Sequence, residues 1–198
     1  MAADYDQMAS NLEDFYPFKD KVVLFVGAGT KQLLDIGRIP KRTISIDQSA
    51  EAIQQLRQHV ETQRLESVVE IVHSDFSDVV THGDVVYFEF CLHEMPDPDI
   101  ALAHAKSLAP DIVVYDHAPG SEWAYLGAEE DKVVRSTQAM ERFGIRRREF
   151  FITNQIFKDY AELLAKVSPQ GPLAVERAAR FADVSGIAIP MDYGLTLL

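Results

Sequence analysis

The sequence predicts an α/β protein whose mostly parallel sheet is closed by an antiparallel hairpin. Short apolar runs alternate with helical segments over residues 21–117, which is typical of a parallel sheet with helices on both faces. The run KVVLFV (21–26) is continuous and rich in β-branched residues, as expected of a strand buried on both faces. Two strand-like stretches end the chain with only a short turn between them, so they must pair antiparallel.

The first two thirds of the chain contain five predicted strands, each a short apolar run: 21–26, 42–47, 67–75, 84–90 and 111–117. A helix is predicted over 48–63, where apolar residues recur at helical spacing and Ser49 can cap the N-terminus. A second amphipathic helix is predicted over 97–110, where Pro110 stops it.

The last third has a different pattern. A helical pattern around 127–143 leads to a further predicted helix within 148–167, whose apolar residues share one face and which Thr153 or Asn154 can cap. The C-terminal hairpin is predicted over 173–198, with strands at 173–181 and 186–198. A homodimer through the exposed edge of this hairpin is an open alternative to a monomer.

Length and composition indicate a single domain over residues 1–198. The formal net charge of -12 opposes nucleic acids and anionic membranes as principal partners. Cys91 is the single cysteine, which excludes a disulfide framework and a CxxC metal site. The N-terminus lacks an apolar signal core, and the longest apolar run is too short to span a bilayer. We therefore expect a cytoplasmic protein.

The first strand runs into a turn formed by Gly27, Ala28 and Gly29. Such a turn brings backbone N–H groups and a helix N-terminus close to an anionic or polar ligand. Asp47, followed by Gln48, ends the second strand 18 residues beyond Gly29. In a doubly wound sheet this point lies beside the first turn, where a carboxylate can accept both hydroxyls of a ribose.

The third strand ends in the same crevice. There Asp75 can accept a hydrogen bond from the amino group of an adenine, and Phe76 can pack on the ring. A GxG pair alone is also compatible with a simple tight turn between a strand and a helix. Three strand ends in the right order indicate a nucleotide-like cofactor.

The chain resembles class I S-adenosylmethionine-dependent methyltransferases, in particular the small-molecule type with one Rossmann-like domain. The resemblance runs from VVLFVGAGTK through ISID and HSDF to FCLHEMPDPDIALAHAKSLAP and the final hairpin, and LHEMPDP (92–98) is its most specific part. It implies a three-layer Rossmann-like fold with the sheet order 3-2-1-4-5-7-6. It also implies S-adenosyl-L-methionine as the cofactor and methyl transfer to a small-molecule acceptor.

The resemblance also implies roles for individual residues on the donor side. Gly27 and Gly29 approach the methionine portion of the donor, and Asp47 holds its ribose. Asp75 and Phe76 flank the adenine. Phe90 and Cys91 pass beneath the sulfonium.

Two positions depart from the family pattern, and they leave two alternatives open. The family usually has an acid two positions before the first glycine, where this chain has Phe25, and a third glycine where it has Lys31. These departures motivate a non-catalytic, methyltransferase-like binding or regulatory protein as one alternative. An NAD(P)-dependent oxidoreductase is the other, and it is disfavoured because GxGxxG would require glycine at Gln32.

Polar residues follow the fourth and fifth strands, at the edge where open α/β sheets bind ligands. His93 is our first candidate for a residue near the reacting groups, and His117 is the second, as a proton acceptor. A histidine at such a point can equally brace its loop. Glu94 and Asp116 complete a set of metal-ligand types. Neighbours in a strand extension point opposite ways, so we expect no metal.

Trp123 and Tyr125, in a segment that leaves the fifth strand, are candidates for lining the acceptor site together with Glu94. Aromatic residues are as often ordinary packing. The N-terminal segment 1–20, with its YDQM sequence, is predicted to fold over the cofactor as a lid. It is too short for a large cap, which favours a small acceptor.

Overall fold

The computed structural model describes residues 4–29, 34 and 40–198. Seven strands form one sheet in the order β3-β2-β1-β4-β5-β7-β6, which confirms the predicted fold class and strand order. They are β1 (Val22–Val26), β2 (Arg42–Asp47), β3 (Val69–His73), β4 (Val85–Glu89), β5 (Asp111–His117), β6 (Arg147–Asp159) and β7 (Ser185–Leu197). The first five are parallel, whereas β7 is antiparallel to both β5 and β6.

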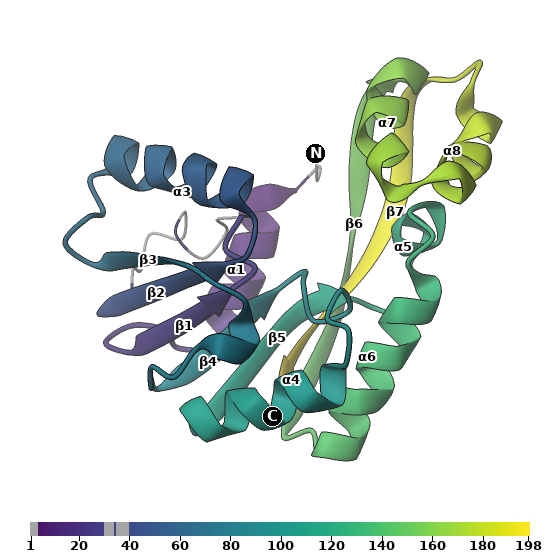
Figure 1. Cartoon of the computed structure of the whole chain (residues 1–198). Helices are drawn as coiled ribbons and strands as arrows, with labels where there is room; N and C mark the ends of the chain where they lie inside the picture. Colours follow the sequence, from purple (N-terminus) through teal and green to yellow (C-terminus); the bar gives the residue numbers. More distant parts are fainter. Residues whose placement is uncertain (1–3, 30–33, 35–39) are drawn as a thin grey trace.

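Helices cover both faces of the sheet (Figure 1). The α-helices in the described part of the chain are α1 (Tyr5–Phe15), α3 (Ala50–Gln63), α4 (Pro98–Leu108), α5 (Glu122–Leu126), α6 (Glu130–Phe143), α7 (Tyr160–Val167) and α8 (Pro172–Ala178). One apolar core lies between the sheet and α1 and α3, and a second lies between the opposite face and α4 and α6. Because β1, β4 and the centre of β5 are buried on both faces, residues 22–26, 85–88 and 112–115 are continuously apolar.

Local sequence explains where several helices begin. The Ser49 hydroxyl accepts a hydrogen bond from the Ala52 N–H, which caps α3 as predicted. The Asp97 carboxylate caps α4 in the same way, and Pro98 occupies its first turn, where a missing N–H costs nothing. Helix α4 ends at Leu108, two residues before Pro110. These caps fix where α3 and α4 begin after β2 and β4.

The predicted boundaries of the C-terminal hairpin are wrong. Residues 173–181 form α8 and a 3-10 turn rather than a strand. The partner of β7 is β6, whose residues 148–159 fall in the segment 148–167 that was predicted to contain a helix. Thr153 and Asn154 lie inside β6, whereas the Asp159 carboxylate caps α7. The apolar residues at helical spacing belong to two elements that meet without a turn residue.

The hairpin of β6 and β7 therefore carries α7 and α8 as an insertion at its far end (Figure 1). At the N-terminus, α1 packs into the core through Met8, Leu12 and Phe15. The Asn11 side-chain amide also donates a hydrogen bond to the Tyr193 hydroxyl, 2.8 Å away. Within the segment predicted as a lid, residues 5–15 therefore form a packed helix, and the lid role stays a prediction. None of the described helices is both long and apolar enough to cross a bilayer.

Candidate functional site

The glycine turn brings the backbone close to the loop after β4. Gly27 has a φ of +75°, and a Cβ there would lie 2.7 Å from both Cβ and Sγ of Cys91. Both the left-handed backbone and this close approach require glycine. The Gly27 N–H donates to the Ile46 carbonyl, and the Gly29 N–H donates to Asp47 Oδ2 at 3.2 Å. Ala28 between them is fully buried.

A cavity of about 350 Å³, the donor-side cavity, lies at this edge of the sheet. It is lined by strand-end and loop residues, which include Gly27, Asp47, Gln48, Asp75, Phe76, Cys91 and Glu94. Most of the predicted cofactor residues therefore meet in one place. Ala28, Gly29 and Phe90 are not part of the lining.

Asp47 and Asp75 both present carboxylates in this cavity. Asp47 Oδ1 accepts from the Ser49 N–H at 2.8 Å, so the carboxylate is oriented by backbone groups on both sides. Asp75 Oδ1 accepts from the N–H and the hydroxyl of Ser77, each at 2.8 Å, and these bonds lower the pKa of Asp75. Both groups are preorganised to accept further hydrogen bonds from hydroxyl or amino groups.

Phe76 is mostly buried and contributes to the wall of the cavity. Its ring packs edge-on against Phe88 and against His104, with centroids 5.3 and 5.0 Å away. His104, for which the sequence indicated no role, also lines the cavity. The aromatic wall therefore comes from two elements.

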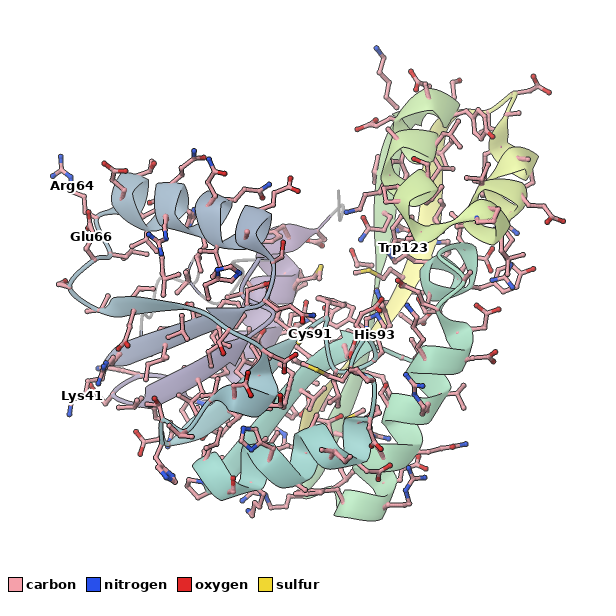
Figure 2. The ribbon with its side chains drawn as sticks, viewed as in Figure 1. Lys41, Arg64, Glu66, Cys91, His93 and Trp123 are labelled. Atoms are coloured by element: carbon pink, nitrogen blue, oxygen red, sulfur yellow. The ribbon has the colours of Figure 1, made fainter. Side chains whose placement is uncertain are left out.

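The segment that follows β4 leaves the sheet through an unusual backbone conformation. Phe90 has a φ of +48°, which is costly for a bulky residue. Its N–H donates to the Tyr115 carbonyl at 2.7 Å, and its ring packs against Tyr115 and His117. The bend directs Cys91 and His93 into the centre of the molecule (Figure 2).

His93 is buried among carboxylates. Its Nδ1 lies 2.5 Å from Asp116 Oδ1, and its Nε2 lies 3.4 Å from Glu94 Oε1 and 3.8 Å from Glu129 Oε2. Burial alone would lower the pKa of His93, but the charge of Asp116 and the other two carboxylates outweigh it and raise the pKa to about 10. Since both ring nitrogens face carboxylates, the geometry favours a charged, oriented side chain over a proton acceptor.

His117 has the opposite environment. Burial lowers its pKa to about 4, and Nδ1 is buried without a hydrogen-bond partner among the described residues. Its backbone N–H donates to Asp116 Oδ1 at 2.8 Å. Burial also raises the pKa of Glu129 to about 7. Glu94, in contrast, has a lowered pKa because His93 and Lys132 both bond to it.

A second cavity of about 820 Å³, the acceptor-side cavity, lies on the other side of residues 90–94. Its lining comes from α1, the loop after β4, α5, the long hairpin and α7: Tyr5, Met8, Phe90, His93, Glu94, His117, Trp123, Glu129, Gln155, Phe157, Glu162, Ala165, Lys166, Gln170 and Met191. Glu94 lines both cavities, so the two meet at this side chain.

The two aromatic candidates for the acceptor site are separated. Trp123 on α5 stacks on Phe157 at 5.6 Å and lies above His93 in Figure 2. Tyr125 is not in the lining of the acceptor-side cavity; its ring lies 3.9 Å from the guanidinium of Arg177. The structure therefore brings only Trp123 to His93 and His117.

Several lining residues were missed because their positions depend on tertiary structure. Glu129 precedes α6 in an acidic run that reads as an ordinary helix start. Gln155 and Phe157 lie in the stretch that we expected to be helical. Correct assignment of β6, whose side chains alternate between faces, would have placed these two on one face.

The departures from the family pattern have different outcomes. Phe25 is fully buried, and its ring packs 5.3 Å from that of Tyr87, so this position belongs to the core. Lys31 and Gln32 lie outside the described residues.

Comparison with known proteins adds independent information. Residues 24–110 match the family described as methyltransferase domain. The family model and the fold confirm the resemblance seen in the sequence and support an enzyme. No curated protein matches the sequence.

The chain shares its fold with several solved structures. A Bacillus halodurans protein, provisionally described as a methyltransferase, has a TM-score of 0.67 and 14% identity, covering 96% of this chain and 97% of that chain. An S-adenosylmethionine-dependent methyltransferase from Aquifex aeolicus has a TM-score of 0.57 and 16% identity, covering 98% and 89%. SpnF, a [4+2]-cyclase, has a TM-score of 0.63 and 16% identity, covering 97% and 79%. The fold therefore also occurs with another chemistry, and the function has to be argued from the site.

Proposed function

We propose that this protein transfers the methyl group of S-adenosylmethionine to a small-molecule acceptor. The observation that carries the proposal is the pair of cavities that meet at Glu94. One has the glycine turn and two oriented carboxylates, and the other has aromatic side chains and two histidines. Methyl transfer needs two bound molecules in contact, and two adjoining cavities provide for this.

On the donor side, we propose that Asp47 accepts the ribose hydroxyls and that Asp75 and Phe76 meet the adenine. Gly27 and Cys91 lie where the methionine portion would pass. Ala28, Gly29 and Gln48 support the same site through the backbone of the turn and the end of β2. The oriented Asp47 carboxylate is the strongest support, because its two backbone bonds hold it at the cavity.

On the acceptor side, we propose that His93 and His117 face the reacting atom, with Glu94 and Trp123 beside them. The acceptor lone pair forms the new bond to the methyl carbon while the carbon–sulfur bond breaks, and the sulfur keeps the electron pair as a thioether. These side chains would hold the acceptor in line and exclude water. Proton acceptance by His117 stays a prediction from the sequence.

The location and assembly stay proposals as well. We propose a single-domain cytoplasmic protein that acts on small molecules and not on nucleic acids. A homodimer would form through β6, the edge strand, which exposes Phe150 and Ile152.

The proposal is tested by turnover. The protein is incubated with S-adenosylmethionine and a panel of small hydroxyl, amine, thiol and carbon acceptors, and S-adenosylhomocysteine is measured by mass spectrometry. Acceptor-dependent product that Asp47→Ala abolishes supports the proposal. Donor binding with no turnover on any acceptor would favour the binding-protein alternative, and hydride transfer from NADH or NADPH would favour an oxidoreductase.

A further inference from the structure

We infer that His93, His117 and Glu129 form a binding site for a divalent metal cation at the acceptor-side cavity. One ligand atom from each residue lies within 4.8 Å of the other two, and all three residues are buried. They come from three separate places: the loop after β4, the end of β5 and the start of α6.

The ligand set suits a borderline divalent cation. Two imidazoles and one carboxylate bind zinc-like ions and leave coordination positions open. His93 Nε2 and Glu129 Oε2, 3.8 Å apart, can both reach one cation at bond lengths of about 2.0–2.2 Å. The farthest pair, at up to 4.8 Å, has to close by roughly 1 Å.

Asp116 orients the His93 ring and also holds the backbone of His117. Its Oδ1 lies 2.5 Å from His93 Nδ1 and accepts from the His117 N–H, and its Oδ2 accepts from the His93 N–H. A carboxylate on the far nitrogen of a histidine is the common outer support of metal ligands, because it fixes the ring and its tautomer. With Nδ1 engaged in this way, Nε2 of His93 is directed toward the other two ligands.

An independent observation concerns His117. Its Nδ1 is buried and makes no hydrogen bond among the described residues, although the ring lines the acceptor-side cavity. A buried polar atom without a partner calls for an explanation such as a bound ion. Coordination of a metal ion by His117 Nδ1 would explain why this atom is buried without a hydrogen-bond partner.

The charges around the cluster also favour a cation. Glu94, Asp116 and Glu129 all face His93, and among the described residues Lys132 brings an ammonium group to Glu94. Gln170, on the other side of Glu129, is neutral and lies 3.4 Å from it. A divalent ion that displaces the Nε2 proton of His93 would neutralise this excess of carboxylates.

The sequence alone predicted no metal, because the adjacent residues of a strand extension point apart. The cluster does not need both members of either adjacent pair: it takes His93 and His117 and adds Glu129 from the start of α6. The catalytic consequence rests on the proposed function: an open coordination position would bind an acceptor oxygen and favour loss of its proton.

The test is binding of Zn²⁺ to the protein after dialysis against a chelator, measured by calorimetry, with Co²⁺ absorption as a spectroscopic probe. We expect one equivalent to bind. Glu129→Gln and His117→Ala should weaken binding by more than the about 10–100-fold expected for Asp116→Asn, which alters only the outer support. His82→Ala, which removes an exposed histidine far from the cluster, is the matched control and should bind as wild type does.

Circular dichroism of each variant establishes folding, and the isosteric Glu129→Gln keeps the test valid if His117→Ala unfolds. Absence of binding by the wild type, or wild-type affinity in a folded Glu129→Gln protein, overturns the inference. A parallel titration with S-adenosylmethionine separates the two proposals. Metal binding without donor binding would reject the proposed function alone, and the reverse would reject the metal site alone.

Discussion

Asp116 contacts His93 twice, once at the ring and once at the backbone: Oδ1 lies 2.5 Å from Nδ1, and Oδ2 accepts from the backbone N–H at 3.0 Å. The same carboxylate accepts from the backbone N–H of His117. One buried acid at the end of β5 therefore fixes the loop after β4 and the residue that follows it. This arrangement links the two sequence-predicted catalytic histidines through a residue that the sequence indicated only as a metal-ligand type.

The pairing of Asp116 with His93 should be measurable as a coupling energy. Asp116→Asn removes the charge from a buried, charge-assisted hydrogen bond, so we expect the free energy of unfolding to fall by about 1.5–3 kcal/mol. A double-mutant cycle with His93→Asn, followed by urea denaturation, should give a coupling within about 0.5–3 kcal/mol. Additive effects of the two changes would contradict the pairing.

Asp47→Ala should weaken donor binding strongly. It leaves the ribose hydroxyls unpaired and frees the Gly29 N–H, so two lost charged bonds at about 1.5–3 kcal/mol each predict at least a 100-fold loss of affinity. Calorimetry with S-adenosylhomocysteine measures it. Glu66→Ala, which removes an exposed carboxylate at the outer edge of the molecule (Figure 2), is the control. Unchanged affinity in a folded Asp47→Ala protein would show that the site is misplaced.

Gly27→Ala should cost more stability than the backbone angle alone explains. The new Cβ would meet Cys91 at 2.7 Å, in addition to the cost of a φ of +75°. Gly186→Ala is the matched control, because its φ is +66° and nothing lies within 4 Å of the added Cβ. We expect Gly27→Ala to lower the melting temperature and the donor affinity more than Gly186→Ala does. Equal losses of stability in the two variants would show that the loop carrying Cys91 can move aside at no cost in free energy, which would contradict this prediction.

The anchor of α1 should be sensitive to acid. Asp111 Oδ2 accepts from the Tyr16 hydroxyl at 2.6 Å, and Oδ1 pairs with Arg146. Burial works against ionisation, but these two partners outweigh it and lower the pKa of Asp111. A lowered folded-state pKa stabilises the protein above about pH 4, and this contribution is lost as the pH falls through the folded-state value. The stability difference between wild type and Asp111→Asn should therefore shrink below about pH 4, and a constant difference would contradict this assignment.

The sequence was sufficient for the strands whose burial forces a pattern. β2 and β5 were predicted at their observed bounds, because in each of them charged residues bound a buried run that is rich in β-branched residues. β6 was missed because it passes directly into α7 at Asp159, with no glycine or proline between them. Residues 173–181 read as a strand, although Pro172 at the first helical position and an alanine-rich sequence favour a helix.

The two sides of the site also differ in how far the sequence predicts them. The donor side was predictable because parallel strands bring their carboxyl ends to one edge, which places Gly27, Asp47 and Asp75 together. The acceptor side depends on how α1, α6 and the long hairpin close over that edge. Glu129 meets His93 only through this packing, which local sequence does not encode.

The central claim is that the cavity at the glycine turn binds S-adenosylmethionine. The most direct measurement is a calorimetric titration of the purified protein with S-adenosylmethionine and S-adenosylhomocysteine, with NADH and NADPH as controls. We predict that the two sulfur compounds bind with one equivalent each and that the nicotinamides do not. Binding of a nicotinamide, or of none of the four compounds, would contradict the account.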